Sequence, residues 1–331
     1  MKLKVFAAAI LPFIASAAIA DDRDWSGLIT AIEENTEDAL TIPPAPGTTV
    51  ISGFDCRISD SDVDALDDDL LLTASESDDS IALHGPWGLP TTSGDYPLLV
   101  HREYLILHDE IMRQPALAQY RLTRSDVRRR TRETCFREDE RIADDNRGTL
   151  ADYDEPIFER GHLIPRADMN RSRNVMINTF LLSNIMPQQP DFNGGVWKTL
   201  ESLIRTWARS KGDIIVVTGP IYDFDGDGAR DNDVDRVRPN DRVGIPSHFF
   251  KVVLHERPSG FIETIAVRLP HSGAEVPEGL DFDEELDIIE DALVSIDDIE
   301  AQTGFDLFPD MEAAKQRAVE RSIAPGIWHD D

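Results

Sequence analysis

The sequence predicts an α+β domain with a central antiparallel sheet flanked by helices. Segments of strand-forming residues recur along the chain, at 104–107, 118–122, 213–218, 248–254 and 261–269. The turn Pro258-Ser259-Gly260 separates the last two and predicts an antiparallel pair. One helix is clear because apolar residues recur at three- and four-residue spacing, and these are Val196, Leu200, Leu203, Ile204 and Trp207. Strands and helices mixed in this way are typical of α+β proteins.

The first twenty residues predict a signal peptide. Lys2 and Lys4 precede an apolar run, and Ala18-Ile19-Ala20 forms a cleavage site of small residues. We therefore expect a mature chain that begins at Asp21 and is secreted or periplasmic. No stretch is long and apolar enough to predict a membrane anchor, so no membrane partner is expected.

Residues 21–95 are interpreted as an acidic N-terminal extension of a globular domain that spans 96–331. Segment 58–80 is rich in Asp and Ser and is interpreted as a solvated linker or a loosely packed segment. The chain has two cysteines, Cys56 and Cys135. In an oxidising compartment these two could pair and tie the extension to the domain.

The charge of the chain bears on its partners. The formal net charge is −30 at pH 7, and without Lys2 and Lys4 it becomes −32, from 31 basic and 63 acidic residues. Such a surface repels nucleic acid at long range, or it indicates adaptation to salt, which screens the repulsion. Seven arginines nevertheless lie within 121–137. They indicate either a phosphate-facing patch or an arginine face that is ion-paired to the acidic surface.

The stretch Glu159-Arg160-Gly161-His162 combines residues that phosphodiester hydrolysis uses. Because side chains alternate along a strand, Arg160 and His162 are expected to face the same side. A guanidinium can hold a phosphate with a planar fork, and a neutral imidazole can accept a proton from water near pH 7. The reaction also needs a divalent cation, which stabilises charge on the phosphate and on the leaving oxygen.

A candidate metal site lies further along the chain. Asn193 precedes the predicted helix and Glu201 follows eight residues later, a little over two helical turns, so both side chains can face one side. An amide oxygen and a carboxylate that holds water suit Mg²⁺, which takes oxygen ligands and keeps several waters. The alternative is that Asn193 only caps the helix and that Glu201 is exposed to solvent.

Separated motifs in one order make the chain from about Tyr104 to Pro309 resemble the ββα-metal DNA/RNA non-specific endonucleases, of the endonuclease G and Serratia nuclease type. The matching motifs are Phe136-Arg137-Glu138-Asp139, Ala151-Asp152-Tyr153, Arg160-Gly161-His162-Leu163, Ser183-Asn184, Pro187-Gln188, Asn193, Trp197, Leu200-Glu201, Thr218-Gly219-Pro220, Pro246 to Lys251 and Thr303 to Pro309. The resemblance implies that the chain has a ββα-metal nuclease fold and that it hydrolyses both DNA and RNA.

The resemblance also implies a role for each matching residue. His162 would be the general base, and Arg160 would bind phosphate or stabilise the transition state. Asn193 would bind Mg²⁺ directly, with Mn²⁺ as a possible substitute, and Glu201 would hold the water shell of the metal. Asn184 would orient the site. Water would then attack phosphorus and leave a 5′-phosphate and a 3′-hydroxyl.

The resemblance also concerns a second phosphate-binding arginine, the residue before Arg160, and the oligomeric state. The family usually has a second, upstream phosphate contact, for which Arg137 or Arg132 is the candidate here. The family commonly has Asp before Arg-Gly-His, whereas this chain has Glu159. The extra methylene could shift a supporting hydrogen bond, which puts the turnover rate in doubt more than the type of reaction. Relatives are often dimers, so the resemblance also makes a homodimer possible.

A second segment resembles the start of an EF-hand calcium loop. It places acids at loop positions 1, 3, 5 and 9, which are Asp223, Asp225, Asp227 and Asp231. Ala229 would offer its backbone carbonyl at position 7, whereas Val234 stands where a bidentate Glu is usual. The segment resembles the structural calcium loop in the nuclease-like domain of ectonucleotide pyrophosphatase/phosphodiesterases. The alternative is an acidic turn that binds no ion.

Three functions fit these patterns. The first is an exported, metal-dependent, sugar-non-specific endonuclease. The second is a catalytically silent, calcium-binding module, which the presence of Arg160, His162, Asn193 and Glu201 disfavours. The third is a phosphodiesterase for small diesters, which the arginines of 121–137 disfavour because they suit a long polyanion.

Overall fold

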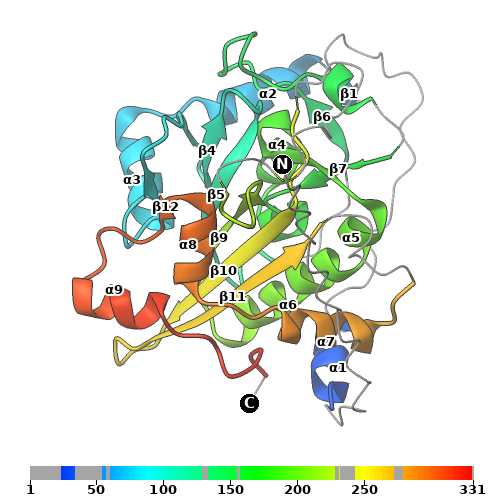
Figure 1. Cartoon of the computed structure of the whole chain (residues 1–331). Helices are drawn as coiled ribbons and strands as arrows, with labels where there is room; N and C mark the ends of the chain where they lie inside the picture. The colour runs from blue at the N-terminus through cyan, green and yellow to red at the C-terminus, as the bar shows by residue number, and fades with distance from the viewer. Residues whose placement is uncertain are drawn as a thin grey trace, which may run out of the picture.

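The computed structural model describes residues 24–33, 54–56, 60–128, 133–154, 157–227, 231, 243–271 and 279–329. Its centre is a six-stranded antiparallel sheet in the order β11-β10-β9-β5-β4-β3 (Figure 1). The strands are β3 (Leu98–Val100), β4 (Leu105–Asp109), β5 (Gln114–Leu122), β9 (Ile214–Ile221), β10 (His248–Glu256) and β11 (Ile262–Pro270). The prediction of an α+β fold with a central antiparallel sheet is confirmed.

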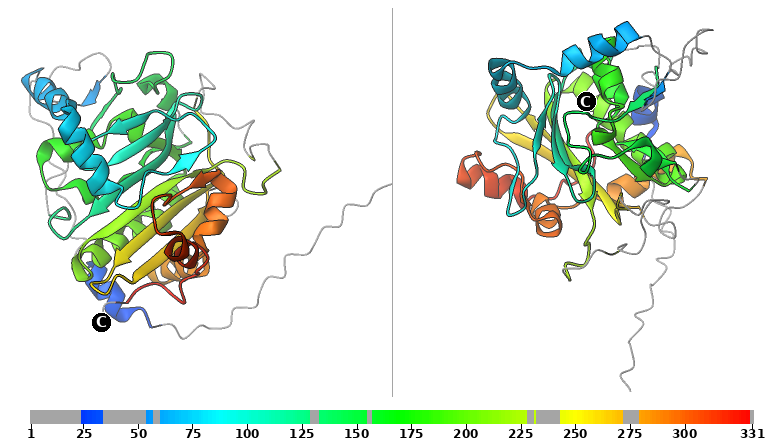
Figure 2. Two further views of the ribbon diagram at one scale, coloured as in Figure 1. Left: turned by 90° about the vertical axis from the view of Figure 1, so that its left-hand side faces the viewer. Right: turned by 90° about the horizontal axis from the view of Figure 1, so that it is seen from above.

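Helices cover both faces of this sheet, and each face has its own hydrophobic core (Figure 2). On one face lies α6 (Val196–Ser210), with α7 (Phe282–Asp291) and α1 (Ser26–Glu33) beside it. On the other face lie α8 (Ile296–Thr303), α9 (Ala313–Glu320) and the pair of β2 (Thr91–Thr92) with β12 (Phe305–Asp306). Strand β9 lies between the two cores and every one of its residues is buried. Burial on both faces explains its unbroken apolar sequence.

Strand β9 continues through Gly219-Pro220, where the sequence predicts its end. Strand β5 pairs with β9 only as far as Thr218, whereas β10 continues to pair as far as Ile221. At Pro220 the strand is therefore paired on one side, and a residue without an N–H is tolerated at such an edge.

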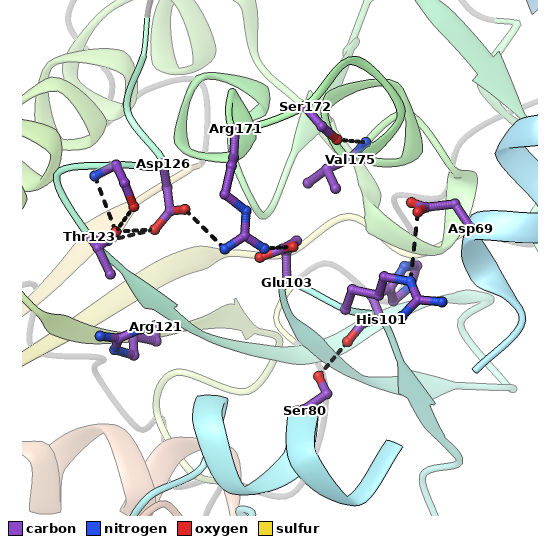
Figure 3. Close-up of polar contacts among 12 residues, drawn as sticks. Asp69, Ser80, His101, Glu103, Arg121, Thr123, Asp126, Arg171, Ser172 and Val175 are labelled. Carbon is purple, nitrogen blue, oxygen red and sulfur yellow. Dashed lines mark hydrogen bonds and ion pairs between the residues drawn. The ribbon is translucent and has the colours of Figure 1, made fainter. Parts of the chain in front are cut away.

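The prediction that 58–80 is a solvated or loosely packed linker is wrong. The segment forms α2 (Asp60–Leu70) and most of α3 (Ala74–His84), and α2 buries Leu66 beside α4 (Arg173–Asn178). The Ser80 hydroxyl of α3 donates to the His101 carbonyl, and Asp69 of α2 faces the Arg102 guanidinium at 3.7 Å (Figure 3). Composition misled the prediction because these helices place a few buried groups inward and most of their acids outward.

A short strand pair also attaches the N-terminal extension to the domain. Strand β1 (Phe54–Cys56) is antiparallel to β6 (Cys135–Arg137), and Cys56 lies opposite Cys135. Cys135 is disulfide-bonded, whereas the side chain of Cys56 lies outside the described residues, so the covalent tie between extension and domain stays a prediction. Among the described residues, no helix is long and apolar enough to cross a membrane.

The residues of the predicted active site lie on a ββα unit on the α6 side of the sheet. Strands β7 (Glu159–His162) and β8 (Ile185–Gln188) are antiparallel, and β8 leads into α5 (Pro190–Gly194) and then α6. The connection from β7 to β8 holds α4 and two 3₁₀ helices, η2 (Arg166–Met169) and η3 (Leu182–Asn184), and a third, η1 (Leu150–Tyr153), precedes β7. This is the ββα arrangement that the resemblance implies.

Candidate active site

Arg160 and His162 lie on one face of β7, where both contact the ring of Phe136. The Arg160 Cζ is 5.2 Å from the centroid of that ring, and the centroid of the His162 ring is 6.0 Å from it. Phe180 meets the His162 ring edge to face at 4.5 Å. The predicted alternation along the strand is confirmed. Aromatic packing thus places a cationic fork and an imidazole side by side.

Gly161 lies between these two residues and packs against Gln188 of β8. A Cβ at position 161 would be 2.0 Å from the Gln188 Oε1 and 2.5 Å from its Cγ. Gln188 is fully buried, so its side chain has little room to move aside. The glycine between Arg160 and His162 is therefore required by packing.

Asn184 of η3 fixes the chain that follows His162. Its Oδ1 accepts a hydrogen bond from the Ile164 N–H at 2.9 Å. Its Nδ2 donates to the carbonyls of Ile164 at 3.0 Å and Thr179 at 2.9 Å. Since the fully buried amide is engaged by backbone at both ends, this geometry supports the orienting role that the resemblance implies.

Asn193 lies in α5 and not at the cap of α6, whose N-cap residue is Gly195. The helix-cap alternative for Asn193 is therefore wrong. Its Nδ2 donates to the Glu159 carboxylate Oε2 at 2.6 Å. This bond fixes which end of the amide faces Glu159 and turns the amide oxygen away as a candidate metal ligand. The longer Glu159 side chain thus makes a supporting hydrogen bond to the candidate ligand.

Glu201 of α6 is not solvent-exposed, because only 15% of its side chain is accessible. Burial raises the pKa of Glu201 to about 7, and the positive charges of Lys251 and Arg205 oppose this rise. The Arg205 Nη1 is 4.0 Å from Glu201 and 3.1 Å from Asp168, whose other oxygen accepts a hydrogen bond from the Tyr120 hydroxyl at 2.7 Å. A carboxylate whose charge is costly to bury gains stability from a nearby cation.

Lys251 of β10 is a residue of this site that the sequence analysis did not assign. Its side chain is fully buried, and its Nζ donates to the Leu163 carbonyl at 3.2 Å and to the Thr218 hydroxyl at 3.3 Å. The same nitrogen lies 4.3 Å from the centroid of the Trp197 ring. Burial lowers the pKa of Lys251 to about 8, and the Glu201 carboxylate opposes the shift. The available signal was a single cation inside the apolar run of 249–254.

His271 is a second unassigned residue, and it holds the start of α5. Its Nε2 accepts a hydrogen bond from the Gln189 N–H at 2.9 Å, so its Nδ1 carries the proton donated to the Pro246 carbonyl at 2.9 Å. Its ring packs against Phe192 and Phe249. Burial lowers the pKa of His271 to about 4. The neutral imidazole therefore fixes the turn that presents Asn193.

Of the arginines of 121–137, Arg121 and Arg137 bind groups within the protein, whereas Arg129, Arg130 and Arg132 lie outside the described residues. The Arg137 side chain is 2% exposed, lies 4.0 Å from Asp67 and donates to the Asn178 Oδ1. This burial argues against Arg137 as the second phosphate contact. Arg132, the other candidate, lies outside the described residues. Arg121 is ion-paired with Asp213, as the alternative of a salt-bridged arginine face predicts.

The acidic loop after β9 brings three of the predicted calcium ligands together. Ligand oxygens of Asp223, Asp225 and Asp227 lie within 4.8 Å of one another. The Asp231 Oδ2 instead accepts hydrogen bonds from the Phe224 N–H at 2.8 Å and the Ser247 hydroxyl at 2.6 Å. Ala229 lies outside the described residues. The first half of the loop thus brings three carboxylates together, whereas Asp231 is hydrogen-bonded to the Phe224 N–H and the Ser247 hydroxyl.

Comparisons with known proteins agree with this geometry. The family model for DNA/RNA non-specific endonucleases matches residues 87–314. Human mitochondrial endonuclease G is 35% identical over 184 residues, which is 55% of this chain and 59% of that protein. The mitochondrial nuclease of Saccharomyces cerevisiae is 32% identical over 199 residues, which is 57% of each.

These matches span less than two thirds of the relatives' own length. Among solved structures, a chain of the EndoG/EndoGI complex, an inhibited endonuclease, matches with a TM-score of 0.60. That match covers 74% of this chain and 96% of the other at 23% identity, and it shows a shared fold.

Proposed function

We propose that this chain, which belongs to the DNA/RNA non-specific endonuclease family, is an exported, metal-dependent hydrolase that cuts phosphodiester bonds inside DNA and RNA. The observation that carries the proposal is the placement of Arg160 and His162 against one ring, Phe136. They share the ββα unit with Asn193, whose amide is oriented by Glu159. Phosphate binding, proton transfer and metal binding would thus meet on one unit.

Each residue has a step in this mechanism. Arg160 holds a phosphate oxygen and stabilises the negative charge that grows there. His162 takes the proton from the attacking water, whose oxygen bonds to phosphorus while the bond to the 3′-oxygen breaks. The 3′-oxygen leaves as a hydroxyl after it gains a proton from solvent, and the phosphate stays on the 5′ side.

The donor set fits a hard divalent cation. Asn193 would supply a neutral oxygen directly, and Glu201 would hold the cation's waters, with Mg²⁺ as the proposed ion and Mn²⁺ as a substitute. When bound, such an ion supplies positive charge to the phosphate and to the leaving oxygen. The Glu201 carboxylate is costly to ionise where it is buried, and a cation would offset that cost.

Export, a structural calcium ion in the loop of Asp223, Asp225 and Asp227, and a homodimer remain proposals. Residues 1–20 support export to the periplasm or the exterior. The convergence of the three aspartates supports calcium and also favours the second candidate function, a silent calcium-binding module.

The salt dependence of activity distinguishes a polymer nuclease from a phosphodiesterase for small diesters. Binding of a polymer through several phosphates weakens steeply with salt, whereas binding of a small diester depends little on salt. We expect an activity optimum at raised salt, since salt also screens the net charge of the chain.

The test is digestion of plasmid DNA and of RNA by the mature protein, with Mg²⁺ or with a chelator. We expect wild type to cut both polymers with Mg²⁺ only, and His162→Ala to be at least ~100-fold slower. The matched control is His255→Ala, a partly exposed histidine at the end of β10, which should match wild type. No cutting by wild type with any metal, together with calcium-dependent stabilisation, would favour the silent module.

A further inference from the structure

Three carboxylates converge on the side of the sheet opposite α6, where α8 meets α9. Asp297 and Glu300 are three residues apart on α8 and so share one helix face. Glu320 is the last residue of α9. One carboxylate oxygen from each of the three lies within 4.8 Å of the others. Oxygens that share one Ca²⁺ at 2.3–2.6 Å are at most about 5 Å apart, so the three can share one ion.

The state of Glu320 is the second observation. Glu320 is only 6% exposed, and its buried Oε1 has no hydrogen-bond donor among the described residues. A buried acceptor without a partner is unusual in a folded protein and requires a proton, a water or an ion. Glu320 therefore has an acceptor without a donor, and one of its two carboxylate oxygens lies where two other carboxylates approach.

The charge around the cluster has the same implication. The Arg321 Nε faces Asp297 at 3.7 Å, but its side chain is 71% exposed and offsets little of the charge. The Glu300 Oε1 accepts a hydrogen bond from the Leu307 N–H at 2.8 Å, so its second oxygen can face the cluster.

We propose that Asp297, Glu300 and Glu320 bind a divalent cation, Ca²⁺ in preference to Mg²⁺, which joins α8 to α9. Ca²⁺ accepts several carboxylates from the protein in irregular geometry, whereas Mg²⁺ needs near-octahedral geometry and gives up its waters reluctantly. The site is separate from the Asp223 loop in sequence, and it does not depend on the proposed nuclease activity. Its role is structural, because it would fasten the C-terminal helix to the body.

The test compares thermal unfolding and calorimetric calcium titration of the full mature protein. The background is Asp223→Asn with Asp225→Asn, which removes two of the three clustered loop aspartates. In that background we expect CaCl₂ at about 100 times Kd to raise Tm by about 5 °C, with one bound ion. Adding Glu320→Gln or Asp297→Asn should abolish both signals. Adding Asp283→Asn, an exposed acid of α7, should preserve both.

Asp297 is half-exposed, so its variant keeps the test valid if Glu320→Gln disturbs folding. The proposal is overturned if the loop background neither binds Ca²⁺ nor gains Tm. A proton shared by Glu300 and Glu320 would then explain the cluster. In that case stability would fall as pH rises from 4.5 to 7, because the raised pKa of Glu300 lets the folded state bind more protons there.

Discussion

The hydrogen bond between Glu159 and Asn193 offers the sharpest test of the proposed metal site. The substitution is Glu159→Ala, which removes the carboxylate that accepts the Asn193 Nδ2 at 2.6 Å. Without that acceptor the Asn193 amide can rotate and present nitrogen to the metal. A cation does not bind the protons of an amide nitrogen, so the fraction of competent amide falls.

The magnitude follows from the type of bond. A hydrogen bond to a charged group contributes about 1.5–3 kcal/mol, and loss of such a supporting partner typically weakens metal binding 10- to 100-fold. The Glu159–Asn193 bond is exposed to solvent, so we expect the lower end. The concentration of Mg²⁺ for half-maximal cleavage should rise about tenfold, while kcat at saturating Mg²⁺ changes much less.

The assay is plasmid nicking at Mg²⁺ concentrations that span three decades. Glu159→Asp, the residue common in the family, and Glu159→Gln, which keeps an acceptor oxygen, serve as matched variants. Both should lie between wild type and Glu159→Ala. An unchanged Mg²⁺ requirement in Glu159→Ala would refute the reasoning, because Asn193 would then need no orientation by this carboxylate.

Three further outcomes test the packing around the site. Gly161→Ala should lower the free energy of unfolding by about 1–3 kcal/mol and reduce cleavage, because its Cβ would overlap the buried Gln188. An unchanged free energy of unfolding, measured by urea denaturation, would contradict this. Lys251→Met should lower the free energy of unfolding by ~3 kcal/mol and slow cleavage at least about tenfold, because the buried Glu201 carboxylate would lose its neighbouring cation. Wild-type stability and wild-type cleavage in this variant would exclude a positioning role for Lys251. Burial lowers the pKa values of His84 and His271 to about 4, so the unfolded state binds protons first as pH falls below 6.5. The contribution of each histidine to stability should drop by up to ~3 kcal/mol between pH 6.5 and 4 and stay constant above pH 6.5, and His271→Gln should therefore remove its share from the slope of urea midpoint against pH.

Local sequence patterns determined much of the architecture and the centre of the site. Alternation along β7 was sufficient to place Arg160 and His162 on one face, because side-chain direction in a strand has a period of two residues. Apolar spacing was sufficient for α6, and the run of 213–218 for the core of β9. Separated motifs in one order identified the family without any contact being known.

Tertiary contacts decided the remaining features of the site, because each of these features depends on two segments that are distant in the chain. Glu159 supports Asn193 only because β7 and α5 are brought together, and Gly161 is required only because β8 places Gln188 over it. Lys251 is one cation in an apolar strand until the fold brings it to the Leu163 carbonyl. Burial of Glu201 and of Arg137, and the packing of α2 and α3, depend in the same way on partners that the local sequence does not contain. Sequence periodicity shows which way a side chain points, and only the folded chain shows what it meets.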